Sequence, residues 1–180
     1  PLSDSAFQAN LEVVILFKQN GQVVKFDKNR LNSPVFEKPS SFVDLKRYSL
    51  DNGDYEIAVS MSDTNMENNV RKYDATFTID FSQEQIGQSD LQLLASFSEV
   101  QPGQEANPLA KNGLVLEPLP SNFYHKYAST LIFDNEIYNS DKAIADDFAV
   151  SYSVYKDGEP GKAVSIGHKK KSAAPVVPLL

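Results

Sequence analysis

Residues 52–62 read Asn-Gly-Asp-Tyr-Glu-Ile-Ala-Val-Ser-Met-Ser, which joins a turn signal to a regular alternation of side chains. Asn52-Gly53 suits the positive φ angles of a tight turn. Apolar side chains then occupy every second position: Tyr55, Ile57, Val59 and Met61. A period of two places them on one face of a β-strand. Such a strand, apolar on one face and polar on the other, is typical of an antiparallel sheet with one face in water.

Working outward toward the N-terminus, the same period predicts a β-hairpin over residues 11–27. Leu11–Phe17 is apolar at every odd position, and Asn20-Gly21 provides a two-residue turn before the next strand. Val14 and Leu16 make the opposite face apolar as well. We therefore expect the middle of this strand to be covered on both sides.

Side-chain patterns and turn residues also predict the remaining strands of the first half. A short strand is expected over Phe42–Tyr48, between a proline-bounded loop and the turn at residue 52. Residues 63–69 form a polar turn, and residues 73–81 alternate apolar and polar side chains after it. Strands therefore fill residues 10–81.

The second half of the chain shows the same short strands and no sustained helical period. The expected strands are Leu91–Phe97, Leu114–Leu116, Leu131–Tyr138, Phe148–Tyr155 and Ala163–Lys171. Residues 82–89 are polar and without period, which marks a boundary. We therefore predict an all-β protein of two tandem antiparallel immunoglobulin-like β-sandwich modules, residues 1–84 and 85–180.

The two modules differ at their C-terminal ends. The first ends with a turn and two long alternating strands, and the second has no counterpart after Lys171, its last expected strand residue. If the modules are alike, the second lacks its last strand pair, and we expect it to be truncated there. An uncovered apolar sheet edge would be a pairing hazard.

The net charge argues against nucleic acid as a partner, and the short apolar runs argue against a membrane-spanning helix. The chain carries 17 basic and 24 acidic residues, a net charge of −7, and such an evenly acidic surface repels nucleic acid. The basic run His168–Lys171 is interpreted as a solvated strand edge. No apolar run approaches the roughly 20 residues of a membrane-spanning helix.

The residue types exclude most catalytic chemistry. With no cysteine, the chain has no thiol nucleophile, disulfide or thiolate metal site. The two histidines, His125 and His168, are not spaced as metal ligands, and no nucleophile-elbow motif is present. We expect no catalytic residue, metal ion or cofactor, and hence no enzyme.

Two acidic stretches resemble cation sites only superficially. Asp63, Asn65 and Glu67 are spaced like the start of a calcium loop, but Asn68 stands where that loop needs glycine. A hairpin turn is the better interpretation. The cluster Asp141, Asp146 and Asp147 is interpreted in the same way, as surface charge.

Five side chains remain as candidates for ligand binding: Phe123, Tyr124, Tyr127, Asp134 and Glu136. The three aromatic residues fall in an expected loop, where they could form a platform for carbohydrate or for a neighbouring domain. Asp134 and Glu136 share one face of a strand, a spacing that suits paired carboxylates of a glycosidase but equally a charged outer face. The region 121–138 thus supports an alternative function, carbohydrate binding.

An ordered set of motifs resembles the N-terminal β-rich region of GWxTD-domain proteins from Bacteroidetes-type bacteria. The segments that carry the resemblance are residues 89–94, 111–118, 121–124, 131–139 and 173–176, together with the turn at 50–55. The resemblance implies exported proteins with tandem immunoglobulin-like modules before a C-terminal GWxTD domain. That motif is absent here, and the resemblance carries over no catalytic residue.

Together these features predict a non-enzymatic interaction or structural module of a larger bacterial envelope protein. Its expected partners are other domains of the same full-length protein or other envelope proteins, with no nucleic acid. Its expected location is periplasmic, outer-membrane-associated or secreted, with the signal segment outside this chain. The lack of cysteine favours an exported protein.

Overall fold

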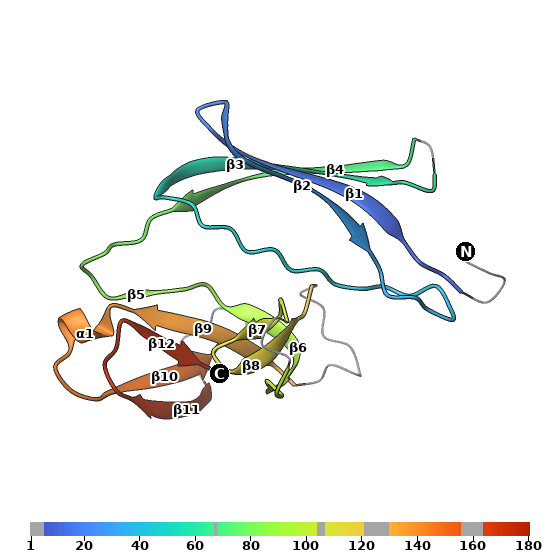
Figure 1. The fold of residues 1–180 in the computed structure, drawn as a ribbon. Helices are drawn as coiled ribbons and strands as arrows, with labels where there is room; N and C mark the ends of the chain where they lie inside the picture. Colours follow the sequence, from blue (N-terminus) through green and yellow to red (C-terminus); the bar gives the residue numbers. More distant parts are fainter. Residues whose placement is uncertain (1–5, 67, 104–106, 121–129, 156–163) are drawn as a thin grey trace. The chain divides into compact units, whose positions relative to one another are not determined.

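The computed structural model describes residues 6–66, 68–103, 107–120, 130–155 and 164–180. These residues form an almost entirely β structure of antiparallel strands, consistent with the predicted all-β sandwich class (Figure 1). Contacts divide the chain into two compact units, Pro1–Phe81 and Ser82–Leu180, which we call unit 1 and unit 2. The division falls close to the predicted boundary between residues 84 and 85. The immunoglobulin-like detail stays a prediction.

Unit 1 is built on one four-stranded antiparallel sheet with the order β2-β1-β3-β4. Its strands are β1 (Asn10–Gln19), β2 (Gln22–Asn32), β3 (Gly53–Asp63) and β4 (Val70–Ile79). The predicted hairpin over residues 11–27 is confirmed. Asn20 and Gly21 have φ angles of 52° and 76°, and Gln19 pairs with Gln22, as a two-residue turn of this type requires.

The core of unit 1 lies on one face of this sheet, which we call the inner face. Val13, Ile15 and Phe17 of β1 are buried there, with Tyr48 and Leu50 packed against them. The odd positions of β1 therefore point inward, as the period of two predicts.

The predicted strand at Phe42–Tyr48 is wrong, because residues 38–52 form no strand in the structure. Instead this segment runs along the sheet (Figure 1). Tyr48, near its C-terminal end, holds it there by two contacts. The Tyr48 ring meets Phe17 edge-on at 5.0 Å, and its hydroxyl donates to Asp27 at 2.7 Å. Because Tyr48 covers the sheet face, the backbone around it does not pair with an edge strand.

Unit 2 contains one larger sheet, one separate hairpin and a single helical turn, α1 (Ser140–Ala143). The larger sheet has the order β12-β9-β6-β8-β7, with β5 also paired to β9. Its strands are β5 (Gly87–Gln88), β6 (Gln92–Glu99), β7 (Ala110–Lys111), β8 (Leu114–Pro118), β9 (Ile132–Tyr138) and β12 (Val176–Leu179). The hairpin joins β10 (Phe148–Val154) to β11 (Val164–Lys171). No described helix is long and apolar enough to cross a membrane.

The expectation that Lys171 ends the last strand is wrong, because β12 follows it. Val176 pairs with Tyr138 and Leu179 with Asn135, so β12 lies antiparallel to β9. Val177 and Leu179 are buried, which explains why this short segment joins the sheet although it contains Pro178. Burial of two aliphatic side chains contributes about 3–6 kcal/mol.

Candidate functional sites

The sequence-predicted candidates divide into two groups. Phe123, Tyr124 and Tyr127 lie outside the described residues, as does His125. Asp134 and Glu136 lie on β9, where the structure defines their surroundings. Their predicted position on one face of the strand is confirmed by a shared partner, since both carboxylates contact Lys111.

The interpretation of Asp134 and Glu136 as a charged outer face is wrong, because both are buried, with 4% and 8% of their surface exposed. The Nζ atom of Lys111 lies 3.0 Å from Oδ2 of Asp134 and 3.2 Å from Oε2 of Glu136. Lys111 is the last residue of β7, and the Asn112-Gly113 turn after it has φ angles of 52° and 80°. From this position the Lys111 side chain reaches the two carboxylates of β9. A buried charge is tolerated when it is paired and hydrogen-bonded in this way.

Neutral donors complete the coordination of Glu136. Asn112 Nδ2 donates to Oε1 at 2.9 Å, and the hydroxyl of Tyr138 donates to Oε2 at 2.7 Å. The backbone N–H of Glu136 donates to the hydroxyl of Ser89 at 2.9 Å. We call Lys111, Asn112, Asp134, Glu136 and Tyr138 the carboxylate network.

The pKa values within this network favour a permanently charged Glu136. Burial alone would raise its pKa, but hydrogen bonds from Tyr138, Asn112 and Lys111 outweigh burial and lower it. The pKa of Tyr138 is raised to about 12, first by burial and then by its bond to Glu136. A general acid needs a raised carboxyl pKa. The lowered pKa of Glu136 is therefore the opposite of what a general acid needs at that position.

One carboxylate in each of the two other acidic stretches, Asp63 and Asp147, has a partner in its own turn or in a nearby strand, and Glu67 lies outside the described residues. Asp63 Oδ1 accepts the backbone N–H of Asn65 at 2.8 Å, which supports the predicted hairpin turn. Asp147 pairs with Lys170 at 2.6 Å and accepts a hydrogen bond from Ser172. The bond from Lys170 is the main cause that lowers the pKa of Asp147. Within the described residues, no group of three acidic or histidine side chains is arranged to hold a metal ion.

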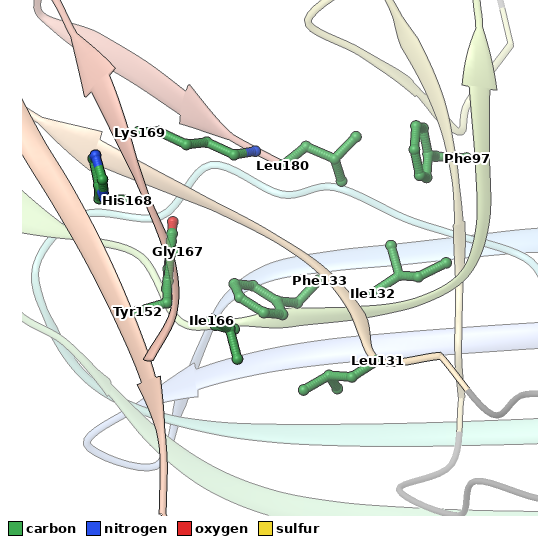
Figure 2. A pocket seen from close by; sticks show the side chains of 10 residues that line it. All are labelled: Phe97, Leu131, Ile132, Phe133, Tyr152, Ile166, Gly167, His168, Lys169 and Leu180. Carbon is green, nitrogen blue, oxygen red and sulfur yellow. The ribbon is translucent and has the colours of Figure 1, made fainter. Parts of the chain in front are cut away.

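An open hollow of about 510 Å³ in unit 2 is a site that the sequence reasoning missed. Its wall comes from β6, β9 and the β10–β11 hairpin, and Figure 2 shows its side chains around one space. The lining residues are Phe97, Leu131, Ile132, Phe133, Tyr152, Ile166, Gly167, His168, Lys169 and Leu180. We call this space the unit 2 hollow. The sequence signal was limited to apolar alternation, which does not distinguish a filled core from an open one.

Tyr152 is held firmly in the wall of the hollow. Its ring meets Phe133 edge-on at 5.2 Å, and its hydroxyl donates to Oδ1 of Asn135 at 3.1 Å. Burial, followed by the charge of Asp134, raises the pKa of Tyr152. Asn135 is almost fully buried, and its Nδ2 has no partner among the described residues. Tyr152 is thus held by one ring contact and one hydrogen bond.

The outer face of the unit 1 sheet is a second open apolar surface. Within unit 1 the inner face of β1 forms the core, while Val14 and Leu16 on the outer face are partly buried, so the predicted covering of that second face stays a prediction. On the outer face, Leu16 lies between Phe26 of β2 and Ala58 of β3, and Phe26 is 68% exposed. Val14 lies on the same face, two residues along β1. We call Val14, Leu16, Phe26 and Ala58 the outer-face patch.

No protein-family model, no curated protein and no solved structure matches this chain. The resemblance to GWxTD-domain proteins therefore stays a prediction. The carboxylate network, the unit 2 hollow and the outer-face patch are the three features on which a function can be argued.

Proposed function

We propose that the chain is a non-enzymatic interaction and structural module of a larger protein of the bacterial envelope. The observation that carries this proposal is the outer-face patch, with Phe26 at 68% exposure in a regular sheet. Exposed contiguous apolar surface is rare unless it binds something. A sheet face with apolar side chains is normally buried against another layer.

The arrangement of the patch suits a second β-layer. Leu16 and its cross-strand neighbours Phe26 and Ala58 span three adjacent strands. Phe26 is exposed, and Leu16 and Ala58 are partly buried beside it. At one end the patch meets an ion pair between Lys28 and Glu12 at 3.1 Å. An apolar centre with a charged rim is the usual anatomy of a protein interface. Two sheets pack face to face about 10 Å apart when both inner faces are apolar.

We take the partner to be another domain of the same full-length protein, with another envelope protein as the second candidate. The absence of cysteine and the resemblance to an exported family support the extracytoplasmic location. The carboxylate network supports a non-enzymatic role, because Lys111 pairs with both of its carboxylates and holds them within the sheet. The carbohydrate alternative then depends on Phe123, Tyr124 and Tyr127, which lie outside the described residues.

Thiol labelling tests the interface, because the chain has no cysteine of its own. Phe26→Cys and Val35→Cys each introduce one exposed thiol, since both native side chains are more than half exposed. In the full-length protein we expect Phe26→Cys to react at least about tenfold more slowly than in this chain alone, because an interface blocks access except during local opening.

Val35 lies outside the sheet, so Val35→Cys should react equally in both proteins and serves as the matched control. Equal rates for Phe26→Cys in the full-length protein, tested in isolation and in the native envelope, would contradict the proposed interface. Labelling of Val35→Cys in intact cells, with a maleimide that cannot cross the inner membrane, tests the location. Failure of that labelling while lysed cells react would contradict an extracytoplasmic location.

A further inference from the structure

The unit 2 hollow exposes more apolar surface than a finished core. Phe97, Leu131 and Ile166 line it, and each is about half exposed, at 50%, 48% and 51%. Large apolar side chains that converge on one open space are typical of ligand sites. The volume of about 510 Å³ lies within the roughly 300–1,000 Å³ range of small-molecule pockets.

One cationic side chain, Lys169, lines the described part of the hollow. His168 and Lys169 belong to its lining, and no acidic side chain does among the described residues. Lys169 can therefore form a direct ion pair with an anionic ligand, while the charge of Asp134 acts on the wall at Tyr152.

Lys169 differs from the lysines beside it. Lys170 pairs with Asp147, and Lys171 donates to the carbonyl oxygen of Pro178 at 2.9 Å. Within the described part of the chain, Lys169 has neither an ion pair nor a side-chain hydrogen bond. In Figure 2 its side chain extends across the hollow toward Leu180, so its ammonium group is available to a ligand in that space.

The two ends of the hollow thus differ in chemistry. In Figure 2, His168 and Lys169 lie at the upper left, Phe97 lies at the upper right beyond Leu180, and Leu131 lies at the bottom. Phe133 and Ile166 lie between Lys169 and Leu131. A ligand that pairs with Lys169 and also fills the apolar part of the hollow has one anionic group and an elongated apolar body.

We propose that the unit 2 hollow binds a fatty acid, with the carboxylate on Lys169 and the alkyl chain against Phe133, Ile166 and Phe97. The apolar chain contributes most of the affinity because it is removed from water. The ion pair with an exposed lysine adds a smaller amount and selects the carboxylate head group. This site is separate from the outer-face patch and does not depend on the interface proposed there.

Isothermal titration of the purified chain with sodium decanoate, below the concentration at which it forms micelles, tests the proposal. We expect saturable binding of one decanoate and weaker binding of 1-decanol, which lacks the charge. Lys169→Met should weaken decanoate binding about two- to fivefold, the usual effect of one exposed ion pair, and leave decanol binding unchanged. Added salt should weaken decanoate binding and leave decanol binding unchanged.

Lys170→Met is the matched control, since Lys170 is adjacent in sequence but pairs with Asp147 outside the hollow. Ile166→Ser should weaken binding of both probes, while Val164→Ser should not, because Val164 is similarly exposed but does not line the hollow. Absence of saturable decanoate binding, or equal loss with Lys169→Met and Lys170→Met, would overturn the proposal. Circular dichroism of each variant separates loss of binding from loss of folding.

Discussion

The ammonium group of Lys111 lies 3.0 Å from the carboxylate of Asp134, although 23 positions separate the two residues in the chain. The same nitrogen lies 3.2 Å from Glu136. One cation thus serves two buried carboxylates, and the turn at Asn112-Gly113 determines whether it reaches them. This arrangement makes the β7–β8 turn the most informative place to perturb unit 2.

Removal of the shared cation should destabilise unit 2 strongly. Lys111→Met keeps most of the side-chain volume but leaves two buried carboxylates without a positive charge. We expect a loss of about 2–4 kcal/mol in the free energy of unfolding, somewhat less than for a fully buried pair because Lys111 is partly exposed. Urea unfolding measures it. Lys142→Met, which removes an exposed partner of Glu84, should change stability by less than about 0.5 kcal/mol. Similar small effects for both variants would contradict a structural role for the network.

The lowered pKa of Glu136 predicts how stability depends on pH. Because its folded pKa is below the ordinary value of 4.5, the ionised carboxylate contributes stability above that value and loses it as pH falls through the folded pKa. Glu136→Gln should therefore be less stable than the native chain near neutral pH, by about 1–3 kcal/mol.

Urea unfolding of the native chain and Glu136→Gln at several acidic pH values follows this difference. It should shrink steadily as the pH falls below 4.5. Glu56→Gln, at an exposed position of β3, should match the native chain throughout. A difference between the native chain and Glu136→Gln that stays constant with pH would contradict the prediction.

Two asparagines with the same backbone conformation separate turn geometry from hydrogen bonding. Asn20 and Asn112 both have a φ angle of 52° and both precede glycine, but Asn112 also donates to Glu136. Glycine keeps the turn and removes the side chain, whereas alanine strains this left-handed conformation by about 1–2 kcal/mol.

Thermal or urea unfolding should therefore show two different patterns. Asn20→Gly should be nearly neutral and Asn20→Ala destabilising, while Asn112→Gly should already cost about 1.5–3 kcal/mol from the lost bond to a charged group. If both glycine variants behave alike, the bond from Asn112 to Glu136 does not stabilise unit 2.

The carbohydrate alternative makes a prediction of its own about residues 121–138. If that region binds sugar, a glycan array should show binding that is lost with Tyr124→Ala or Tyr127→Ala, because stacked aromatic rings provide most of the contact with a sugar face. Under the function proposed above we expect no glycan to bind. Reproducible binding that depends on Tyr124 would overturn that expectation.

Local patterns predicted the strands well, and long-range packing explains what they missed. The Asn20-Gly21 turn and the alternation at Leu11–Phe17 determine backbone geometry within a few residues, so sequence alone predicts that hairpin. The segment before Tyr48 has strand-like residues, but its backbone follows the contacts of Tyr48 with Phe17 and Asp27. Those partners are distant in sequence, and no local pattern encodes the contacts.

The candidate site shows the same limit. The alternation on β9 correctly predicts that Asp134 and Glu136 share a face, but an exposed and a buried carboxylate look alike in a sequence. The two carboxylates are buried because Lys111 of β7 pairs with them. That pair requires β6 and β8 to lie between β7 and β9 in the sheet. The unit 2 hollow was missed for a related reason, because its lining comes from β6, β9, β10 and β11, with no motif that connects them.

The position of Lys111 at the end of β7 also bears on the order in which unit 2 assembles. β7 pairs with β8, β8 with β6, and β6 with β9, so the lysine reaches its carboxylates only after three strand pairings are in register. We expect contacts that need three prior pairings to be largely absent from the folding transition state, so that they slow unfolding more than they speed folding. The carboxylate network is therefore expected to act mainly on the unfolding rate of the sheet. A shift of the β8 register by one residue would turn the Lys111 side chain away from β9 and leave Asp134 and Glu136 buried without a cation.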